Sequence, residues 1–212
     1  MEDILDVYSR PYDLDYPVVC LDEKPLQLLA DARCKREMSP GKMERIDNEY
    51  IRCGTCCIFM FTEPLAGWRY TDAQEQRTKV DWAKQIKWLL TEQYPNAKKV
   101  ILVNDNLNTH NTSSLYEAFA PSEAFALAQR LEIHYTPKHG SWLNIAEIEL
   151  SALGRQCLGK RRISNLVDLN SEMASWHCKR NAGQKSVDWQ FTTSDARIKL
   201  KRLYPVIEDS KF

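Results

Sequence analysis

The sequence predicts an α/β protein in which one mixed β-sheet carries helices on its faces. Strand-like segments come first, and then helix, strand, helix, strand and helix alternate. The run Val100–Val103 is continuously apolar, which is typical of a strand covered on both faces. Residues 72–94 instead have apolar side chains at helical spacing. This order favours one sheet with helices packed on it.

An antiparallel meander is expected in the first part of the chain. The expected strands are Val18–Leu21, Leu26–Ala30, Glu49–Phe61 and Trp68–Thr71. The first strand ends at Asp22, Pro25 precedes the second, and Gly54 is expected to interrupt the third. Residues 31–47 contain a proline, a glycine and several basic side chains, which predicts a loop that faces DNA.

Helices and strands alternate in the second part of the chain. The expected helices are 72–94, 113–130 in two pieces interrupted at Pro121, 166–181 and 195–204, the last of which is expected to be either a helix or an extended arm. The expected strands are 100–103 and 131–135. The last of these helices is rich in lysine and arginine. No internal repeat or low-complexity tract is visible.

Length and composition indicate a folded globular protein. The chain has 212 residues, of which 43% are hydrophobic and 27% charged, enough for one domain with a real core. No apolar run approaches the roughly 20 residues that span a bilayer, so no membrane partner is expected. The first ten residues are acidic and lack an apolar signal core, which predicts a cytoplasmic protein.

The charge is unevenly distributed although the net charge is zero. Residues 151–212 hold 12 basic against 6 acidic side chains, and residues 1–150 hold 17 against 23. A basic C-terminal part suits binding to phosphate. Solvated helix faces explain the same pattern equally well.

Seven cysteines, an odd number without a signal peptide, favour reduced thiols. Cys53, Cys56 and Cys57 form a C-x-x-C-C cluster. A structural zinc site needs further ligands at suitable spacing, and the sequence offers no second pair. The cluster leads into the apolar run 58–61, so small buried thiols are the favoured interpretation over zinc.

The segment Tyr135–Leu150 has the strongest functional pattern. A loop leads into an amphipathic helix, for which Ser141 is the expected N-cap. At about 100° per residue, Glu147 shares its face with small and polar residues, as expected of a group that lines a groove. Glu149 points to the apolar side, which predicts a buried partner. Taken alone, Glu147 fits a solvated helix face better than a catalytic site.

Two other acidic residues strengthen the catalytic interpretation. Asp22 ends the apolar run that begins at Val18, and Asp105 ends the run that begins at Val100. Two strands that end in aspartate, with a later helix that presents Glu147, form a pattern suited to two divalent ions. Mg²⁺ prefers carboxylate oxygens, and two such ions can stabilise the attacking and leaving oxygens of a phosphoryl displacement.

The blocks V-C-L-D-E-K-P, V-N-D-N-L-N-T-H and T-P-K-H-G-S-W-L-N-I-A-E-I-E resemble the three catalytic blocks of DDE transposases. The resemblance is greatest to the bacterial insertion sequence 630 family of the mariner-like superfamily, and it extends over roughly residues 17–205. It implies a ribonuclease-H-like fold with a mixed five-stranded sheet and helices on both faces. In that fold the first and fourth strands are neighbours, so that Asp22 and Asp105 meet.

The resemblance implies a catalytic role for each of the three acidic residues. Asp22, Asp105 and Glu147 become the catalytic carboxylates and the ligands of two Mg²⁺ ions, for which Mn²⁺ can substitute. The implied activity is cleavage of a phosphodiester at a transposon end, followed by transfer of the freed 3′ end into target DNA at TA dinucleotides. The expected partners are DNA and a second copy of the chain, in a bacterial cytoplasm with the nucleoid.

Several nearby residues have more than one interpretation. Asn144 is expected to orient Glu147 or a metal-bound water, and Lys138 and His139 to hold the scissile phosphate. His110 and His139 are either supporting groups of the catalytic centre or loop residues bonded to backbone. Trp142 either stacks on a base or packs in the core, and the core is favoured. Glu23 should point away from Asp22 and is not expected to be a ligand.

Residues 1–16 are expected to be a loose lead-in or a short docking segment. Residues 17–160 are expected to be the catalytic domain, and residues 161–212 a basic helical extension packed on it. The resembling transposases also have N-terminal helix-turn-helix modules, so the chain is expected to be the catalytic part alone. Two other functions remain open: a catalytically idle, truncated transposase that regulates by binding DNA or dimerising, and a nuclease that cuts RNA in hybrids.

Overall fold

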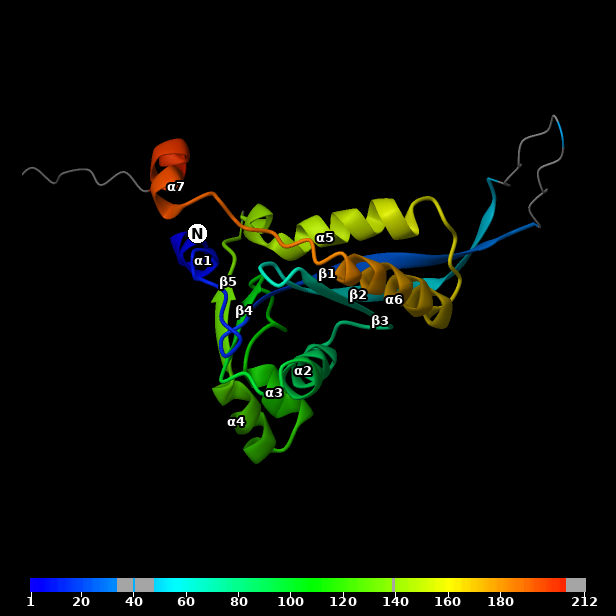
Figure 1. Ribbon diagram of the computed structural model, residues 1–212. Coiled ribbons are helices and arrows are strands. Elements are labelled where there is room, and N and C mark those ends of the chain that lie inside the picture. The colour runs from blue at the N-terminus through cyan, green and yellow to red at the C-terminus, as the bar shows by residue number, and fades with distance from the viewer. Residues whose placement is uncertain (34–39, 41–47, 139, 205–212) are drawn as a thin grey trace, which may run out of the picture.

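The computed structural model describes residues 1–33, 40, 48–138 and 140–204. Five strands form one sheet in the order β3-β2-β1-β4-β5 (Figure 1). The strands are β1 Val18–Asp31, β2 Tyr50–Glu63, β3 Trp68–Gln74, β4 Val100–Asn104 and β5 Leu131–Tyr135. The expected mixed sheet is confirmed, since β1, β2 and β3 are antiparallel neighbours and β4 is parallel to both β1 and β5.

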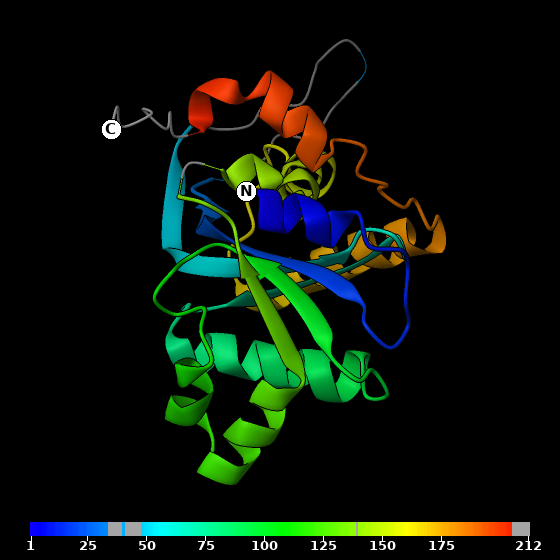
Figure 2. The ribbon, with the colours of Figure 1, turned by 90° about the vertical axis from the view of Figure 1, so that its left-hand side faces the viewer.

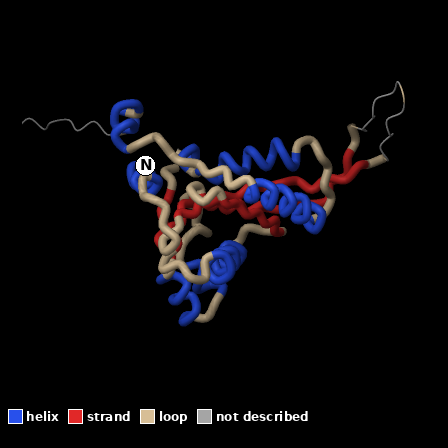
Figure 3. The backbone as a smooth tube through the Cα atoms, in the orientation of Figure 1, coloured by secondary structure: helices blue, strands red, loops and turns tan. Residues whose placement is uncertain are grey.

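Helices cover both faces of this sheet, as expected (Figures 1 and 3). The α-helices are α1 Glu2–Tyr8, α2 Lys79–Trp88, α3 Ser113–Ala118, α4 Pro121–Gln129, α5 Ile145–Leu153, α6 Leu166–Ala182 and α7 Thr193–Lys199. Residues of α1, α5 and α6 share one apolar core with one face of the sheet. Residues of α2, α3 and α4 form the core on the other face. No helix in the described part of the chain is long and apolar enough to cross a membrane.

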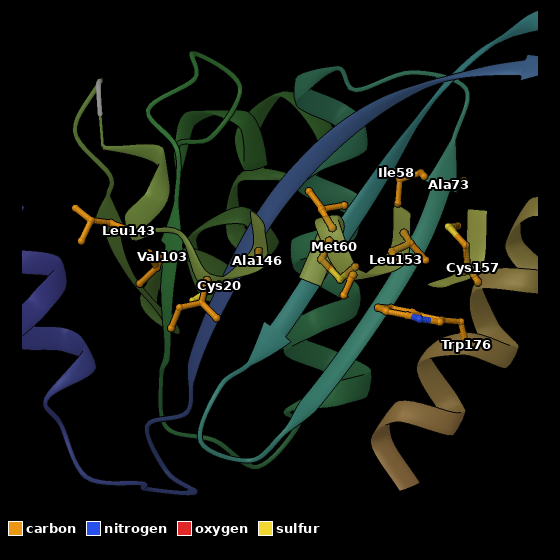
Figure 4. Packing of buried hydrophobic residues seen from close by; sticks show 14 of the residues in the cluster. Cys20, Ile58, Met60, Ala73, Val103, Leu143, Ala146, Leu153, Cys157 and Trp176 are labelled. Atoms are coloured by element: carbon orange, nitrogen blue, oxygen red, sulfur yellow. The ribbon is translucent and has the colours of Figure 1, made fainter. Parts of the chain in front are cut away.

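An apolar core between the sheet and helices α5 and α6 holds these helices against the sheet. Figure 4 shows Cys20, Met60 and Val103 of the strands and Leu153 and Trp176 of the helices in one cluster. Cys20, Met60 and Val103 are fully buried. Burying apolar surface contributes about 25 cal/mol per Å², so this packing is what holds α5 against β1.

The long strand β1 differs from expectation. Leu26–Ala30 was expected to pair back as a separate strand, but it continues β1 and pairs with β2 as far as Asp31. Pro25 is tolerated because β4 pairs with β1 only at Val18–Cys20, so the strand has an open side from there onward among the described residues. A register shift lies between Gln27 and Leu29.

Two further boundaries differ in the meander. Gly54 was expected to break the strand, but β2 continues through it, with Gly54 at φ +107° where a glycine is favoured. Asp72–Gln74 was expected to be helical and is the end of β3, because residues 68–74 alternate between more and less buried positions. Helix α2 begins only after Thr78, which forms a capping box with Asp81. Its last turn, Leu89–Gln93, is π-helical.

The lead-in is ordered rather than loose. Helix α1 buries Ile4, Leu5 and Val7, which its short sequence supplies on one face. Arg197 of α7 donates to Glu2 of α1 at 2.7–2.8 Å, and the two helices lie side by side (Figure 2). The loop expected to face DNA lies mostly outside the described residues, because 34–39 and 41–47 are not described.

Candidate active site

Asp22 lies in β1 with its side chain on the α5 face of the sheet. Its neighbour Cys20, two residues away, belongs to the core under α5, whereas Leu21 belongs to the opposite core. Burial and, to a lesser extent, the negative charges of Asp105 and Glu147 together raise the pKa of the Asp22 carboxyl to about 6. The backbone N–H of Glu23, which donates to Asp22 at 2.8 Å, acts in the opposite direction.

Asp105 directly follows the last residue of β4 and is level with Asp22. The parallel register pairs Val18 with Ile101 and Cys20 with Val103, so the same offset matches Asp22 to Asp105. The expected adjacency of the first and fourth strands is therefore confirmed. Asp105 is partly exposed, with a side-chain exposure of 38%.

Glu147 is in the first turn of α5, and Asn144 is the residue that starts this helix. The Asn144 side chain accepts from Ala146 N at 3.1 Å and donates to the Leu21 carbonyl at 2.8 Å. Ser141 was expected to be the N-cap; it instead begins a short 3₁₀ helix, Ser141–Leu143. Asn144 takes the cap because it has an extended backbone and is itself a strong N-cap residue.

The three carboxylates suit a hard divalent cation. Their oxygens are the ligand type that Mg²⁺ prefers, and a cation would offset the mutual repulsion seen in the raised pKa of Asp22. Among the described residues, however, no three acidic, histidine or cysteine side chains lie close enough together to enclose an ion. The donor chemistry fits a metal, although these side chains alone do not form a closed coordination shell.

His110 is buried, with an exposed fraction of 1%, and lies between two carboxylates. Its Nδ1 is 2.5 Å from Oδ1 of Asp105, and its Nε2 is 2.9 Å from Oε1 of Glu23. Burial disfavours its charged form, but the contacts with Asp105 and Glu23 outweigh burial and raise the pKa of His110 to about 9. The ring also stacks on Trp82, with centroids 5.9 Å apart. The imidazole therefore links Asp105 to a buried anchor.

That anchor is Glu23, for which the sequence predicted only that it would not be a metal ligand. Its side chain lies on the opposite face of β1 from Asp22, is 2% exposed, and also approaches Arg77 at 3.6 Å. Strand alternation predicted the direction, but nothing in the sequence connected Glu23 with His110, which is 87 positions away. Arg77 was likewise not singled out, because it was expected within the helix 72–94, whereas it lies in the loop before α2.

Trp142 and Lys138 lie on the surface near the start of α5. Trp142 is 42% exposed, so the core-packing interpretation was wrong. Its ring is stacked on Trp189, with centroids 6.3 Å apart, and meets Phe191 edge-on. Lys138 is exposed. His139, expected to hold a phosphate, lies outside the described residues.

Glu149 has the buried partner that its position predicted. Its carboxylate is 3% exposed and lies 2.9 Å from Nε of Arg69 in β3 and 3.0 Å from the guanidinium of Arg180 in α6. Arg69 also donates to the carbonyls of Gly67 and Lys185. The second half of α5 is thus fixed by charge to both the sheet and α6.

The cysteine cluster lies in β2, where part of it is buried and part is exposed to solvent. Cys56 and Cys57 are buried, as expected, whereas Cys53 is exposed. Burial raises the pKa of the Cys57 thiol to about 12. These thiols pack in the strand, and no metal-binding group of cysteines is found among the described residues.

One sheet between two helical layers, with Asp22 within β1 and Asp105 just after β4, is the arrangement of a nuclease catalytic domain. Residues 17–170 match the family described as DDE superfamily endonuclease, and the chain belongs to this family. It is therefore an endonuclease-type enzyme. No curated protein matches the sequence.

Solved structures agree with this fold. The chain is similar to the Mos1 mariner strand transfer complex, with a TM-score of 0.57, 17% identity, and coverage of 84% of this chain and 51% of that one. It is also similar to the Mos1 mariner paired end complex with Mn, with a TM-score of 0.55, 17% identity, and coverage of 84% of this chain and 52% of that one. For the catalytic domain of Mos1 mariner transposase, the TM-score is 0.54 and the identity 14%, and the match covers 84% of this chain and 76% of that one. The chain thus has the expected ribonuclease-H-like fold and spans about half the length of the first two chains.

Proposed function

We propose that this chain is the catalytic domain of a transposase that cuts DNA strands and transfers them, a member of the insertion sequence 630 family within the mariner-like superfamily. The observation that carries the proposal is electrostatic. Asp105 and Glu147, from two other sequence blocks, both raise the pKa of Asp22. Carboxylates gathered around Asp22 of β1, with Asp105 level with it after β4, are suited to phosphodiester chemistry.

Asp22, Asp105 and Glu147 would hold the divalent ions, two Mg²⁺ or their Mn²⁺ substitutes. Such ions would stabilise the charge on the attacking and leaving oxygens during phosphoryl transfer. The similarity to Mos1 complexes described as containing Mn or Mg supports this assignment. The hard carboxylate oxygens of Asp22, Asp105 and Glu147 also fit either ion.

The remaining residues of the site position these carboxylates and the DNA. Asn144 holds the first turn of α5, and with it Glu147, against β1. His110 holds one oxygen of Asp105. Lys138 and His139 would neutralise the scissile phosphate, and the exposed ring of Trp142 would stack on a base next to it.

The proposed partners are transposon ends, target DNA that contains TA, and a second copy of the chain in the active complex. Similarity to structures described as paired end and strand transfer complexes supports DNA as the partner. Residues 17–160 would form the catalytic domain, with 1–16 and 161–212 packed on it. Its setting would be a bacterial cytoplasm, with the nucleoid.

The test is cleavage and joining of labelled duplex DNA that carries a transposon end, with Mg²⁺ or Mn²⁺. The wild-type chain should cut and join strands, and Asp105→Asn should lose both activities while staying folded, as circular dichroism would show. Retained cleavage by Asp105→Asn would overturn the assignment of the site. Binding without cleavage by the wild type would favour an idle regulator, and cleavage confined to RNA–DNA hybrids would favour a hybrid nuclease.

A further inference from the structure

A basic groove of about 450 Å³ lies between the helical turn η3, Gly154–Leu158, and the second half of α6. Four basic side chains and one acidic side chain line it, together with a tryptophan: Arg161, Lys179, Arg180, Lys185, Glu172 and Trp176. The wall residues come from η3, from α6 and from the turns that follow them, and the core below holds these segments together. The groove is therefore a built feature of the fold with an excess of positive charge.

Two of the four cations already have acidic partners. Arg161 pairs with Glu172 at 2.6 Å, and Arg180 pairs at 3.0 Å with Glu149. Lys179 and Lys185 form no ion pair among the described residues, and both are exposed. These two ammonium groups give the groove its uncompensated charge.

The tryptophan forms the floor of the groove rather than a stacking surface. Trp176 is 9% exposed, and its indole N–H donates to Gln156 at 3.1 Å. The guanidinium of Arg180 lies over its ring, 5.2 Å from the centroid. The groove therefore offers cations and little free aromatic surface, which suits phosphate better than a base.

The groove is on the same face of the sheet as the acidic site. Helix α5 continues into η3, and Gln156 follows Glu147 by nine residues, about 14 Å along the helix axis. At a rise of about 3.4 Å per base pair, this distance corresponds to roughly four base pairs. Lys24, two residues beyond Asp22 on β1, reaches the intervening Gly154, where its Nζ is 3.5 Å from the position of an added Cβ.

We propose that this groove binds the sugar-phosphate backbone of the DNA whose strand is cut at Asp22, Asp105 and Glu147. The inference rests on the proposed function and adds a second contact region to it. Residues 172–185 lie beyond the part of the chain that matches the endonuclease family, so membership in the family does not account for this half of the groove. The phosphate backbone is the ligand because the groove offers point charges without base-reading geometry.

The alternative explanation is that Lys179 has a structural role. Lys179 lies in the last turn of α6, where a cation also stabilises the helix dipole. That role predicts a lower melting temperature on substitution and no specific effect on DNA. Lys185 follows the helix and would have no such effect.

The experiment compares two double variants of the full chain in binding a labelled 30-base-pair duplex, by fluorescence anisotropy over a series of salt concentrations. One is Lys179→Ala/Lys185→Ala. The control, Lys84→Ala/Lys99→Ala, removes the same charge from α2 and from the residue before β4, where both lysines are exposed. If each groove lysine meets one phosphate, the slope of log affinity against log salt falls by about 1.8 in the groove variant alone.

An unchanged slope in the groove variant, or an equal fall in the control, would overturn the proposal. A lower melting temperature without a change of slope would assign Lys179 to the helix end and also overturn it. Cleavage separates this result from the proposed function. The groove variant should need more DNA to reach half-maximal cleavage, whereas Asp105→Asn should bind with the wild-type slope and not cut.

Discussion

The side-chain amide of Asn144 donates a hydrogen bond to the backbone carbonyl of Leu21 at 2.8 Å. Leu21 is the residue before Asp22, and Asn144 is the residue that caps the helix of Glu147. One buried amide thus connects the strand that carries one carboxylate to the helix that carries another. The carbonyl that it uses lies just beyond Cys20, the last residue of β1 that pairs with β4.

Replacing Asn144 by Ala should therefore reduce both stability and cleavage. The loss of the cap costs about 1–2 kcal/mol, and the Leu21 carbonyl loses its donor in a buried position. Urea denaturation measures the first effect, and single-turnover cleavage at saturating DNA measures the second. Ser141→Ala is the matched control, since Ser141 begins the neighbouring 3₁₀ helix without a side-chain cap bond. Equal cleavage by the two variants would contradict the positioning role.

The buried carboxylate of Glu149 predicts a large cost for its neutralisation. Glu149→Gln would leave Arg69, which is 2% exposed, without its full counter-charge. Breaking a buried pair by removing one partner costs about 3–5 kcal/mol. The free energy of unfolding from urea titration should fall by about that amount. Glu147→Gln, the same change two residues earlier on a half-buried face, should alter stability by less than about 1 kcal/mol.

The charge of Asp22 makes stability depend on pH. Its pKa is raised from 3.8 to about 6 in the folded chain, so the native state holds a proton that the unfolded state has lost in this range. The stabilising contribution is present below pH 3.8 and is lost as pH rises through 6. Across this window the free energy of unfolding should fall by about 3 kcal/mol relative to Asp22→Asn. Urea titrations between pH 4 and 7 test this, and parallel curves for the two proteins would contradict it.

The sequence was sufficient for the parts of the molecule that depend on local pattern. The strands at Val100 and Leu131 and the helix from Leu166 follow from apolar runs and spacing, and the direction of Glu149 follows from helical geometry. The meeting of Asp22 with Asp105 needed the resemblance, because no local pattern sets the order of strands in a sheet.

Other features depended on contacts far apart in the chain. The link from Glu23 through His110 to Asp105 joins a strand to a loop more than 80 residues away. The cap of α5 is Asn144 rather than Ser141, and its side chain also donates to the distant Leu21 carbonyl, which the sequence does not reveal. Trp142 was expected in the core by its size, but the segment near Trp189 leaves half of its ring uncovered.

Divalent ions should stabilise the chain at neutral pH if the carboxylates hold them. Adding Mg²⁺ or Mn²⁺ offsets the repulsion among Asp22, Asp105 and Glu147, and binding to the native state alone raises the melting temperature with ion concentration. At 100 times the dissociation constant, the gain is about 2.7 kcal/mol. Asp105→Asn should show a much smaller rise, and Glu117→Gln, a surface carboxylate paired with Lys79, should behave as the wild type. An equal rise in all three proteins would indicate non-specific binding.

The exposed ring of Trp142 predicts a contact with a base beside the cleavage site. One indole face packs near Trp189 and Phe191, and 42% of the side chain is accessible, within the loop that leads into the helix of Glu147. Stacking contributes about 1–3 kcal/mol per base, so Trp142→Ala should weaken DNA binding roughly 5- to 150-fold. Trp142→Phe should retain most of the affinity, because it keeps an aromatic face. A duplex with 2-aminopurine at the cleavage position gives the direct measurement. Its fluorescence should be quenched by the wild type and by Trp142→Phe, while equal quenching by Trp142→Ala would show that the base stacks elsewhere.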